Sequence, residues 1–381
     1  MGTYADREGI ICLRLEDQTN DGYGVDPSAS ADPYGTGAIG VVDPSSADAI
    51  YVEDPSIKGS RTSIARTGPS PYEHGYMPVA GPADVGFSAK LELAPQTLTA
   101  TPVIADIPRS LDAGLRCGGL YPVVSAGAND DRITYGVKSN PQDSVTAYLY
   151  QTNANDNKGF IHKAHGLRGG FTLELTAEER AFFTPDAIGS AYARTPHTSS
   201  RSSLGLPTFD FSTAPIVGGG FGCSIKAVTA GESYPDAGRV VSFTYNRSGQ
   251  QVQRGVCGQK SAVIPGEAQT ATLDLEVADY SDFDPWQYQG QDNATLALPD
   301  ALLIQMYTTG FTFNDAGERV SGSGDYILTR GYFYITNVEM GSDAGALTYS
   351  LSLQSAYAPG TLAGQLPGDS IFSVAFGTYT P

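Results

Sequence analysis

The sequence predicts a mainly β protein arranged in two halves, and three observations support this prediction. Apolar and polar residues alternate along many short segments, which is the period of a strand with one buried face. The 381 residues include 45 Gly and 24 Pro, which favour frequent turns. The 22 Tyr, 15 Phe and 40% hydrophobic residues supply enough core material for an ordered chain rather than a disordered one.

Residues 1–80 are expected to form an extended, loop-rich region that joins the first domain. Strands are predicted at 10–15 and 49–53, between segments rich in Asp-Pro pairs and small residues. The segment 56–68 is locally basic in an acidic protein and is predicted to be a loop. Long loops in ordered proteins are usually functional, or they are ordered by a partner.

The first β domain is predicted over residues 81–190. Its opening strand, 86–93, alternates apolar residues with Ser88, Lys90 and Glu92. A short helix is expected over 108–117, followed by Gly118-Gly119. Further strands are predicted at 132–137, 143–150, 159–163 and 170–175. A hairpin loop at 153–159 is rich in residues that tolerate positive φ.

A linker at 191–206 is expected to lead into the second β domain, 207–381. A short helix is predicted over 280–288, with Pro285 near its first turn. The predicted strands are 220–228, 239–245, 270–277, 301–307, 331–338 and 346–353. Two of them echo strands of the first half, but at different offsets along the chain. An internal duplication and an unrelated second half therefore both stay open.

The net charge of −18 argues against a nucleic-acid-binding protein, because phosphate binding requires clustered Lys and Arg. The acidic surface either keeps the protein in solution or faces DNA without holding it. No apolar run is long enough to span a bilayer, and the start of the chain lacks a secretory pattern, so folding in a cytoplasm is expected. Four widely spaced cysteines predict free thiols.

No residue pattern predicts an active site, a metal centre or a bound cofactor. His162 and His165 form the only histidine pair, and residues three apart on a strand face opposite sides. The glycine-rich segment 218–222 lacks the Lys-Ser/Thr ending of a phosphate loop. The acidic segment 279–284 is better explained as a helix N-terminus than as a calcium loop. We therefore expect a protein that is not an enzyme.

The order of the segments resembles the major tail tube proteins of long, flexible-tailed (siphovirus-type) bacteriophages. The resemblance covers residues 50–380, whereas residues 16–50 are longer and richer in Asp-Pro than the family leads us to expect. The matching segments are Lys58-Gly59-Ser60-Arg61, the strand 87–93, the helix end Leu115-Arg116-Cys117-Gly118-Gly119, Ile133-Thr134-Tyr135, 144–150, 165–173 and the closing 370–376.

The resemblance implies two tandem tail-tube-like β-sandwich or barrel domains, each with a short flanking helix. Copies of such a chain form stacked rings around a channel for DNA. It also implies a virion protein assembled in the bacterial host cytoplasm, with tail terminator, tape measure and distal tail proteins as partners. A trimeric ring with pseudo-sixfold symmetry is favoured over a hexamer.

Two groups of residues are candidates for roles in such a tube. Polar-face acids of the predicted strands would line the lumen, and these are Glu92, Glu174, Asp274 and Glu276. An orientation of these acids toward the outside is equally open. The basic segment would contact the neighbouring ring through Lys58, Arg61 and Arg66.

Two other classes of protein fit parts of the sequence. A receptor-binding or carbohydrate-binding spike or adhesin would use the many tyrosines to stack on sugars. A secreted surface-layer or sheath protein is disfavoured by the missing signal pattern. A polysaccharide-cleaving enzyme would need paired carboxylates in a groove, whereas a tube subunit would need none and would polymerise.

Overall fold

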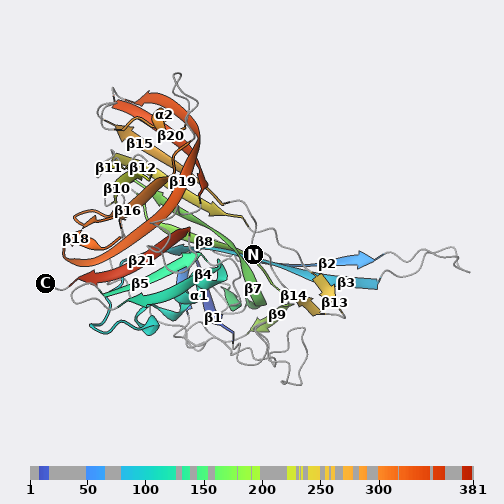
Figure 1. Ribbon diagram of the computed structural model, residues 1–381. Helices are drawn as coiled ribbons and strands as arrows, with labels where there is room; N and C mark the ends of the chain where they lie inside the picture. The colour runs from blue at the N-terminus through green and yellow to red at the C-terminus, as the bar shows by residue number, and fades with distance from the viewer. Residues whose placement is uncertain are drawn as a thin grey trace, which may run out of the picture.

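The computed structural model describes most of the predicted strands and two helices. It covers residues 8–16, 49–64, 79–125, 131–137, 144–152, 159–177, 179–189, 191–197, 221–228, 231, 233–234, 239–248, 254–256, 259–261, 269–277, 283–289, 299–315, 317–343, 346–356 and 371–379. Within these residues the protein is mainly β, with a large antiparallel sheet, and this confirms the predicted class (Figure 1).

The described part of the first half contains nine strands and one α-helix. These are β1 (Glu8–Leu15), β2 (Ala49–Ile64), β3 (Val79–Glu92), α1 (Arg109–Cys117), β4 (Leu120–Ser125), β5 (Asp131–Val137), β6 (Val145–Thr152), β7 (Gly159–Thr176), β8 (Phe182–Gly189) and β9 (Ala191–His197). A short 3₁₀ turn at Ile104–Asp106 precedes α1.

The described part of the second half contains twelve strands and one short helix. These are β10 (Phe221–Ala227), β11 (Ser233–Tyr234), β12 (Arg239–Arg247), β13 (Arg254–Val256), β14 (Gln259–Ser261), β15 (Gln269–Val277), α2 (Trp286–Gln289), β16 (Leu302–Thr308), β17 (Thr312–Phe313), β18 (Arg319–Ser321), β19 (Gly324–Asp343), β20 (Ala346–Ser355) and β21 (Phe372–Tyr379).

Six strands of the first half close into a ring of antiparallel pairings, in the order β1, β2, β3, β8, β7, β6 and back to β1. Helix α1 packs against this ring through Leu111, Leu115 and Cys117, which are buried. The helix ends where Gly119 adopts a positive φ of 86°, a conformation that glycine enters without steric cost.

Strand β7 bends at Gly166, whose φ is 68°. The buried carboxylate of Glu16 is hydrogen-bonded at this bend. It accepts hydrogen bonds from the Ser144 hydroxyl (2.6 Å), the Thr146 hydroxyl (2.7 Å) and the Gly166 amide (2.7 Å). When Glu16 is ionised, the Thr146 hydroxyl gives its one proton to Glu16, and Nδ1 of His165 at 3.2 Å is then the donor in its contact with Thr146.

Glu16 predicts a pH dependence of stability. Burial raises the pKa of this carboxyl above its ordinary value of 4.5, despite the hydrogen bonds that lower it. The folded state therefore binds the proton more tightly than the unfolded state does, and this contribution is lost as pH rises through the raised pKa. In urea unfolding, the stability of the wild type relative to Glu16→Gln should fall as pH rises above 4.5. A difference that grows with pH would contradict burial as the dominant effect.

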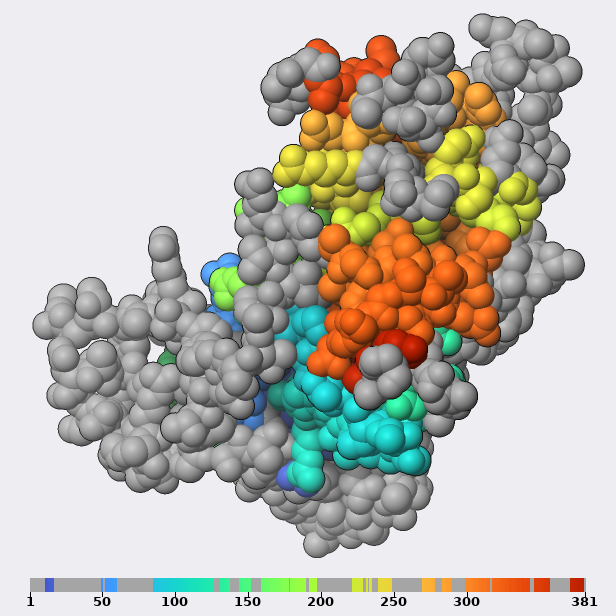
Figure 2. All heavy atoms as spheres, turned by 90° about the vertical axis from the view of Figure 1, so that its left-hand side faces the viewer, coloured from blue at the N-terminus to red at the C-terminus, as the bar shows by residue number. Residues whose placement is uncertain are grey.

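Among the described strands, two pairings join the halves of the chain. Strand β12 pairs with the last residues of β7, and the C-terminal strand β21 pairs with β5 as well as with β19. Figure 2 shows β21, in red, between the orange strands of the second half and the cyan residues of the first. The core is continuous across this junction. The ring centroids of Tyr245 and Phe372 are 3.8 Å apart in a stacked arrangement, and those of Phe171 and Tyr245 are 5.5 Å apart.

Several segments differ from the sequence-based prediction, and among them are β4 and β8, which were not predicted as strands. Strand β2 continues to Ile64, so part of the expected basic loop is strand, paired with β3. Residues 191–197 were expected to belong to the linker but form β9, which pairs with β7. Helix α2 begins at Trp286, later than predicted, and the Asp284 carboxylate accepts a hydrogen bond from the Trp286 amide at 3.1 Å.

Candidate assembly surface

One antiparallel sheet runs through both halves of the chain. Its strand order is β2, β3, β8 and β7 from the first half, followed by β12, β15, β20 and β19 from the second. We call the β7–β12 pairing at its centre the seam. At the seam, Phe171 to Thr176 of β7 lie opposite Arg247 to Ser242 of β12.

The two faces of this sheet differ sharply in polarity because burial alternates along its strands. One register row crosses seven strands on the buried face, and its members are Leu91, Phe183, Leu173, Tyr245, Ala271, Leu353 and Ile335. The adjacent row crosses the same strands on the opposite face, and its members are Glu92, Phe182, Glu174, Thr244, Thr272, Ser352 and Asn337. We call this second side the polar face.

The four acids expected to share a face all lie on the polar face. Glu92 and Glu174 flank Phe182 in register, one on each side of β8. Asp274 lies on β15 between Ser242 of β12 and Ser350 of β20. Glu276 follows two residues later on the same strand, opposite Arg239 and Thr348. Strand alternation is sufficient to place these four side chains on one face, since the sheet is continuous.

Each of these acids has a polar partner on this face of the sheet or at its edge. Arg180 bridges Glu92, at 3.0 Å, and Glu53. Lys90 lies 3.5 Å from Glu174, and Arg239 lies 3.8 Å from Glu276. Asp274 accepts a hydrogen bond from the Ser242 hydroxyl. Partial burial raises the pKa of the Glu92 carboxyl. These ion pairs are half-exposed, so each contributes little to stability and its charged groups remain in contact with solvent.

Phe182 is an aromatic residue on this mainly polar face. The ammonium of Lys90 lies 5.6 Å from its ring centroid, and the guanidinium of Arg180 lies 5.3 Å away. Two cations that also pair with carboxylates therefore cover the ring. The pattern of alternation marks Lys90 as a polar-face residue, but the sequence carries no signal that Arg180 reaches β3, because that contact depends on the β3–β8 pairing.

The basic residues expected to contact a neighbouring ring are not in a loop where the structure describes them. Lys58 is exposed on β2, and the backbone of Arg61 belongs to the same strand. Arg66 lies outside the described residues. The far ends of β2 and β3 project from the body of the molecule as an arm (Figure 1). Lys58 lies opposite Gly86 of β3, which also pairs with Ile188 of β8, so Lys58 belongs to the body of the sheet, whereas Arg61 lies further along β2, opposite Ala83.

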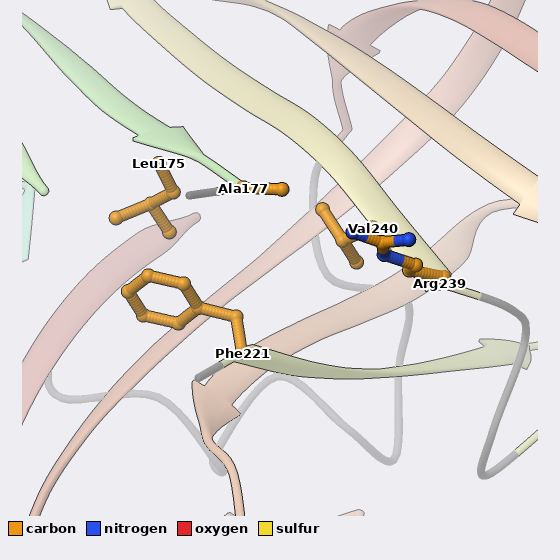
Figure 3. Close-up of a pocket in the computed structure, with 5 residues that line it drawn as sticks. All are labelled: Leu175, Ala177, Phe221, Arg239 and Val240. Carbon is orange, nitrogen blue, oxygen red and sulfur yellow. The ribbon is translucent and has the colours of Figure 1, made fainter. Parts of the chain in front are cut away.

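A small pocket of about 160 Å³ lies at one end of the seam. It is lined by Leu175 and Ala177 after β7, Phe221 at the start of β10, and Arg239 and Val240 of β12 (Figure 3). Arg239 is the one charged group in this lining. The pocket is a gap between packed strand ends and does not hold the paired acid and base that catalysis requires.

The described residues contain no cluster of three or more His, Cys, Asp or Glu side chains suited to a metal ion. His162 contacts the Tyr192 hydroxyl at 2.8 Å and Gln151 at 2.9 Å, so it is part of a surface network. Cys12, Cys117 and Cys223 are buried free thiols, whereas Cys257 lies outside the described residues. None of the helices within the described ranges is both long and apolar enough to cross a bilayer.

Comparison with known proteins gives no family assignment. A scan against protein-family models and a search of curated proteins each returned no match for this sequence. The functional interpretation therefore depends on the residues and on the geometry of the sheet.

Proposed function

We propose that this protein is the structural subunit of a long-tailed bacteriophage tail tube, and that it self-assembles into stacked rings around a channel for DNA. The observation that carries the proposal is the single sheet spanning both halves of the chain. One face of that sheet is a continuous apolar core, and the other carries Glu92, Glu174, Asp274 and Glu276 among serines and threonines.

The polar face suits the wall of a channel through which DNA moves without being held. Hydroxyl groups keep the surface hydrated, and the carboxylates repel the phosphate backbone. The chain as a whole carries a net charge of −18, so carboxylates outnumber the cations that could hold DNA. In this proposal the four acids line the lumen, and DNA passes without specific binding.

The strand pairings support two tandem tube-like domains, 81–190 and 207–381, with β1 and β2 of the N-terminal region completing the first. In the first half β6 pairs with β1 and β7, and in the second half β16 pairs with β10 and β19. In the first half, β8 and β9 both pair with β7, and β8 also pairs with β3. In the second half, β20 and β21 both pair with β19, and β20 also pairs with β15. Three such chains would give a ring with pseudo-sixfold symmetry, which we favour over six.

The proposal places the protein in the virion tail, assembled in the bacterial host cytoplasm, with no enzymatic activity and no cofactor. In this proposal Lys58, Arg61 and Arg66 contact the neighbouring ring. Tail terminator, tape measure and distal tail proteins are the expected partners at the ends and in the lumen of the tube.

Negative-stain microscopy and native mass spectrometry of the purified protein test this function. We expect rings or tubes with a central channel, and ring masses that correspond to three chains. A monodisperse monomer at high protein concentration would contradict the proposal, and masses of six chains would replace the trimer with a hexamer. Binding to a glycan array by a monomer would favour the spike or adhesin alternative.

A further inference from the structure

We infer that residues 337–343 of β19 pair with residues 54–59 of β2 in a second copy of the chain, in the same antiparallel way that β7 pairs with β12 at the seam. This inference rests on the proposed function, because it names the strands that close the ring. The argument uses three observations, which are the seam as a template, the two open strand edges and the exposed apolar residue Met340 beside one of them.

The seam shows how the two halves of one chain join. Strand β7 pairs with β6 over its first residues and with β12 over Phe171 to Thr176. Strand β12 is the first strand of a hairpin with β15, as β2 is the first strand of a hairpin with β3. Strand β19 corresponds to β7. The first part of β19 pairs with β16 and β21 and its last part with β20, just as the first part of β7 pairs with β6 and β9 and a later part with β8.

The strands that correspond to the two sides of the seam each have an open edge. Within the described residues, 337–343 of β19 pair with β20 alone. Likewise, beyond Glu53 the described part of β2 pairs with β3 alone, since β1 ends its pairing there. Unpaired edges of this length invite pairing with another chain. The two edges lie at opposite ends of the sheet, so one molecule cannot join them to each other without a partner.

One apolar residue at the open edge of β19, Met340, is exposed where apolar residues at the seam are buried. At the seam, Phe171, Leu173 and Leu175 of β7 point into the core and are at most 1% exposed. On β19, Met340 lies on the same side of the sheet as buried Tyr349 but is 62% exposed. A neighbouring strand with its own core behind it would cover Met340, as β12 covers the apolar residues of β7.

The proposed contact joins two different edges, so it is heterologous and repeats from copy to copy. Such a contact generates a closed ring when the rotation between copies closes, and a helical filament when it does not. Each added copy extends the polar face by its own eight strands, which are β2, β3, β8 and β7 of the first half and β12, β15, β20 and β19 of the second. The sheet within the chain and the sheet between chains would then form one continuous wall.

Cysteine cross-linking tests the pairing directly. Ser56, Asn337 and Glu339 lie on the polar face near the two edges, opposite Ser88, Ser352 and Ser350. Ser56→Cys is combined with Asn337→Cys or with Glu339→Cys, in a Cys257→Ser background that leaves the buried thiols in place. Because facing residues on paired strands are close enough for a disulfide, at least one pair should give covalent oligomers that reductant reverses. Ser56→Cys with Val320→Cys is the control that should stay monomeric.

A matched pair of lysine substitutions provides the second measurement. Met340 and Val320 are exposed to 62% and 64%, so lysine at either site leaves the folded monomer intact. Met340→Lys should raise the concentration needed for assembly by about tenfold or more, because the charge would be buried at the new seam. Val320 lies on β18, outside the large sheet, so Val320→Lys should change the concentration needed for assembly by less than about twofold.

The outcomes separate this inference from the proposed function. Rings that form normally but give no cross-link in either pair, or that tolerate Met340→Lys as well as Val320→Lys, would overturn the pairing and leave the tube function standing. A wild-type chain that never assembles would overturn both. Cross-linked ladders that end at a fixed number of chains would support the pairing and count the copies in the ring.

Discussion

Arg247→Ala is expected to lower the free energy of unfolding by about 3 kcal/mol, because charged hydrogen bonds are lost inside the core. The side chain is 2% exposed, and its Nη1 donates to the carbonyls of Gly118 (3.3 Å) and Gly119 (3.0 Å). These carbonyls lie at the end of α1, where a cation is favourable. The residue therefore ties the second half of the chain to the helix of the first.

The matched control for this prediction is Arg239→Ala, on the same strand. Its side chain is 59% exposed and lies 3.8 Å from Glu276, so its loss should change stability by less than about 1 kcal/mol. Urea unfolding of both variants at neutral pH provides the comparison. Equal stabilities of the two variants would show that the buried guanidinium does not hold the halves together.

Reversing charge on the polar face is expected to convert a channel that repels DNA into one that binds it. The double substitution Asp274→Lys and Glu276→Lys changes the charge of each chain by four and repeats around the ring. Assembled wild-type protein should not retain a short duplex, whereas the variant should. The variant's affinity should fall roughly a thousandfold between about 50 and 200 mM salt if about six phosphates are neutralised.

A control with the same charge change distinguishes the polar face from the rest of the surface. Asp315 and Glu318 precede β18, outside the large sheet, and Asp315 pairs with Lys226 as Glu276 pairs with Arg239. Asp315→Lys with Glu318→Lys should bind much less DNA than the polar-face variant. Equal binding by the two variants would mean that only net charge matters, and that the polar face has no special exposure to DNA.

The sequence was sufficient to predict the β class and the common face of the four acids. Alternation along 86–93 and 270–277 assigns Glu92, Asp274 and Glu276 to the polar side of their strands, and the register of the sheet then aligns them. Local pattern decides which side of a strand a residue occupies. It therefore predicts faces well whenever the strands belong to one sheet.

Contacts between distant strands could not be predicted in this way. The segment 220–228 echoes the strand 86–93 in sequence, but β10 pairs with β16 as β1 pairs with β6, so its structural counterpart is β1 rather than β3. The sequence pattern predicts Arg247 to be a polar residue just after a strand, and only the β7–β12 pairing buries its side chain against the end of α1. Strand β2 continues through a bulge at Asp54, with a φ of 49°, and Pro55, two residues that usually end a strand.

A cryo-electron microscopy reconstruction of the assembled protein tests the central proposal most directly. We expect a hollow ring or tube in which the strands from β2 to β19 form the inner wall, with Glu92, Glu174, Asp274 and Glu276 facing the channel. An assembly with these four acids on its outer surface, or a protein that stays monomeric at every concentration, would contradict the proposal.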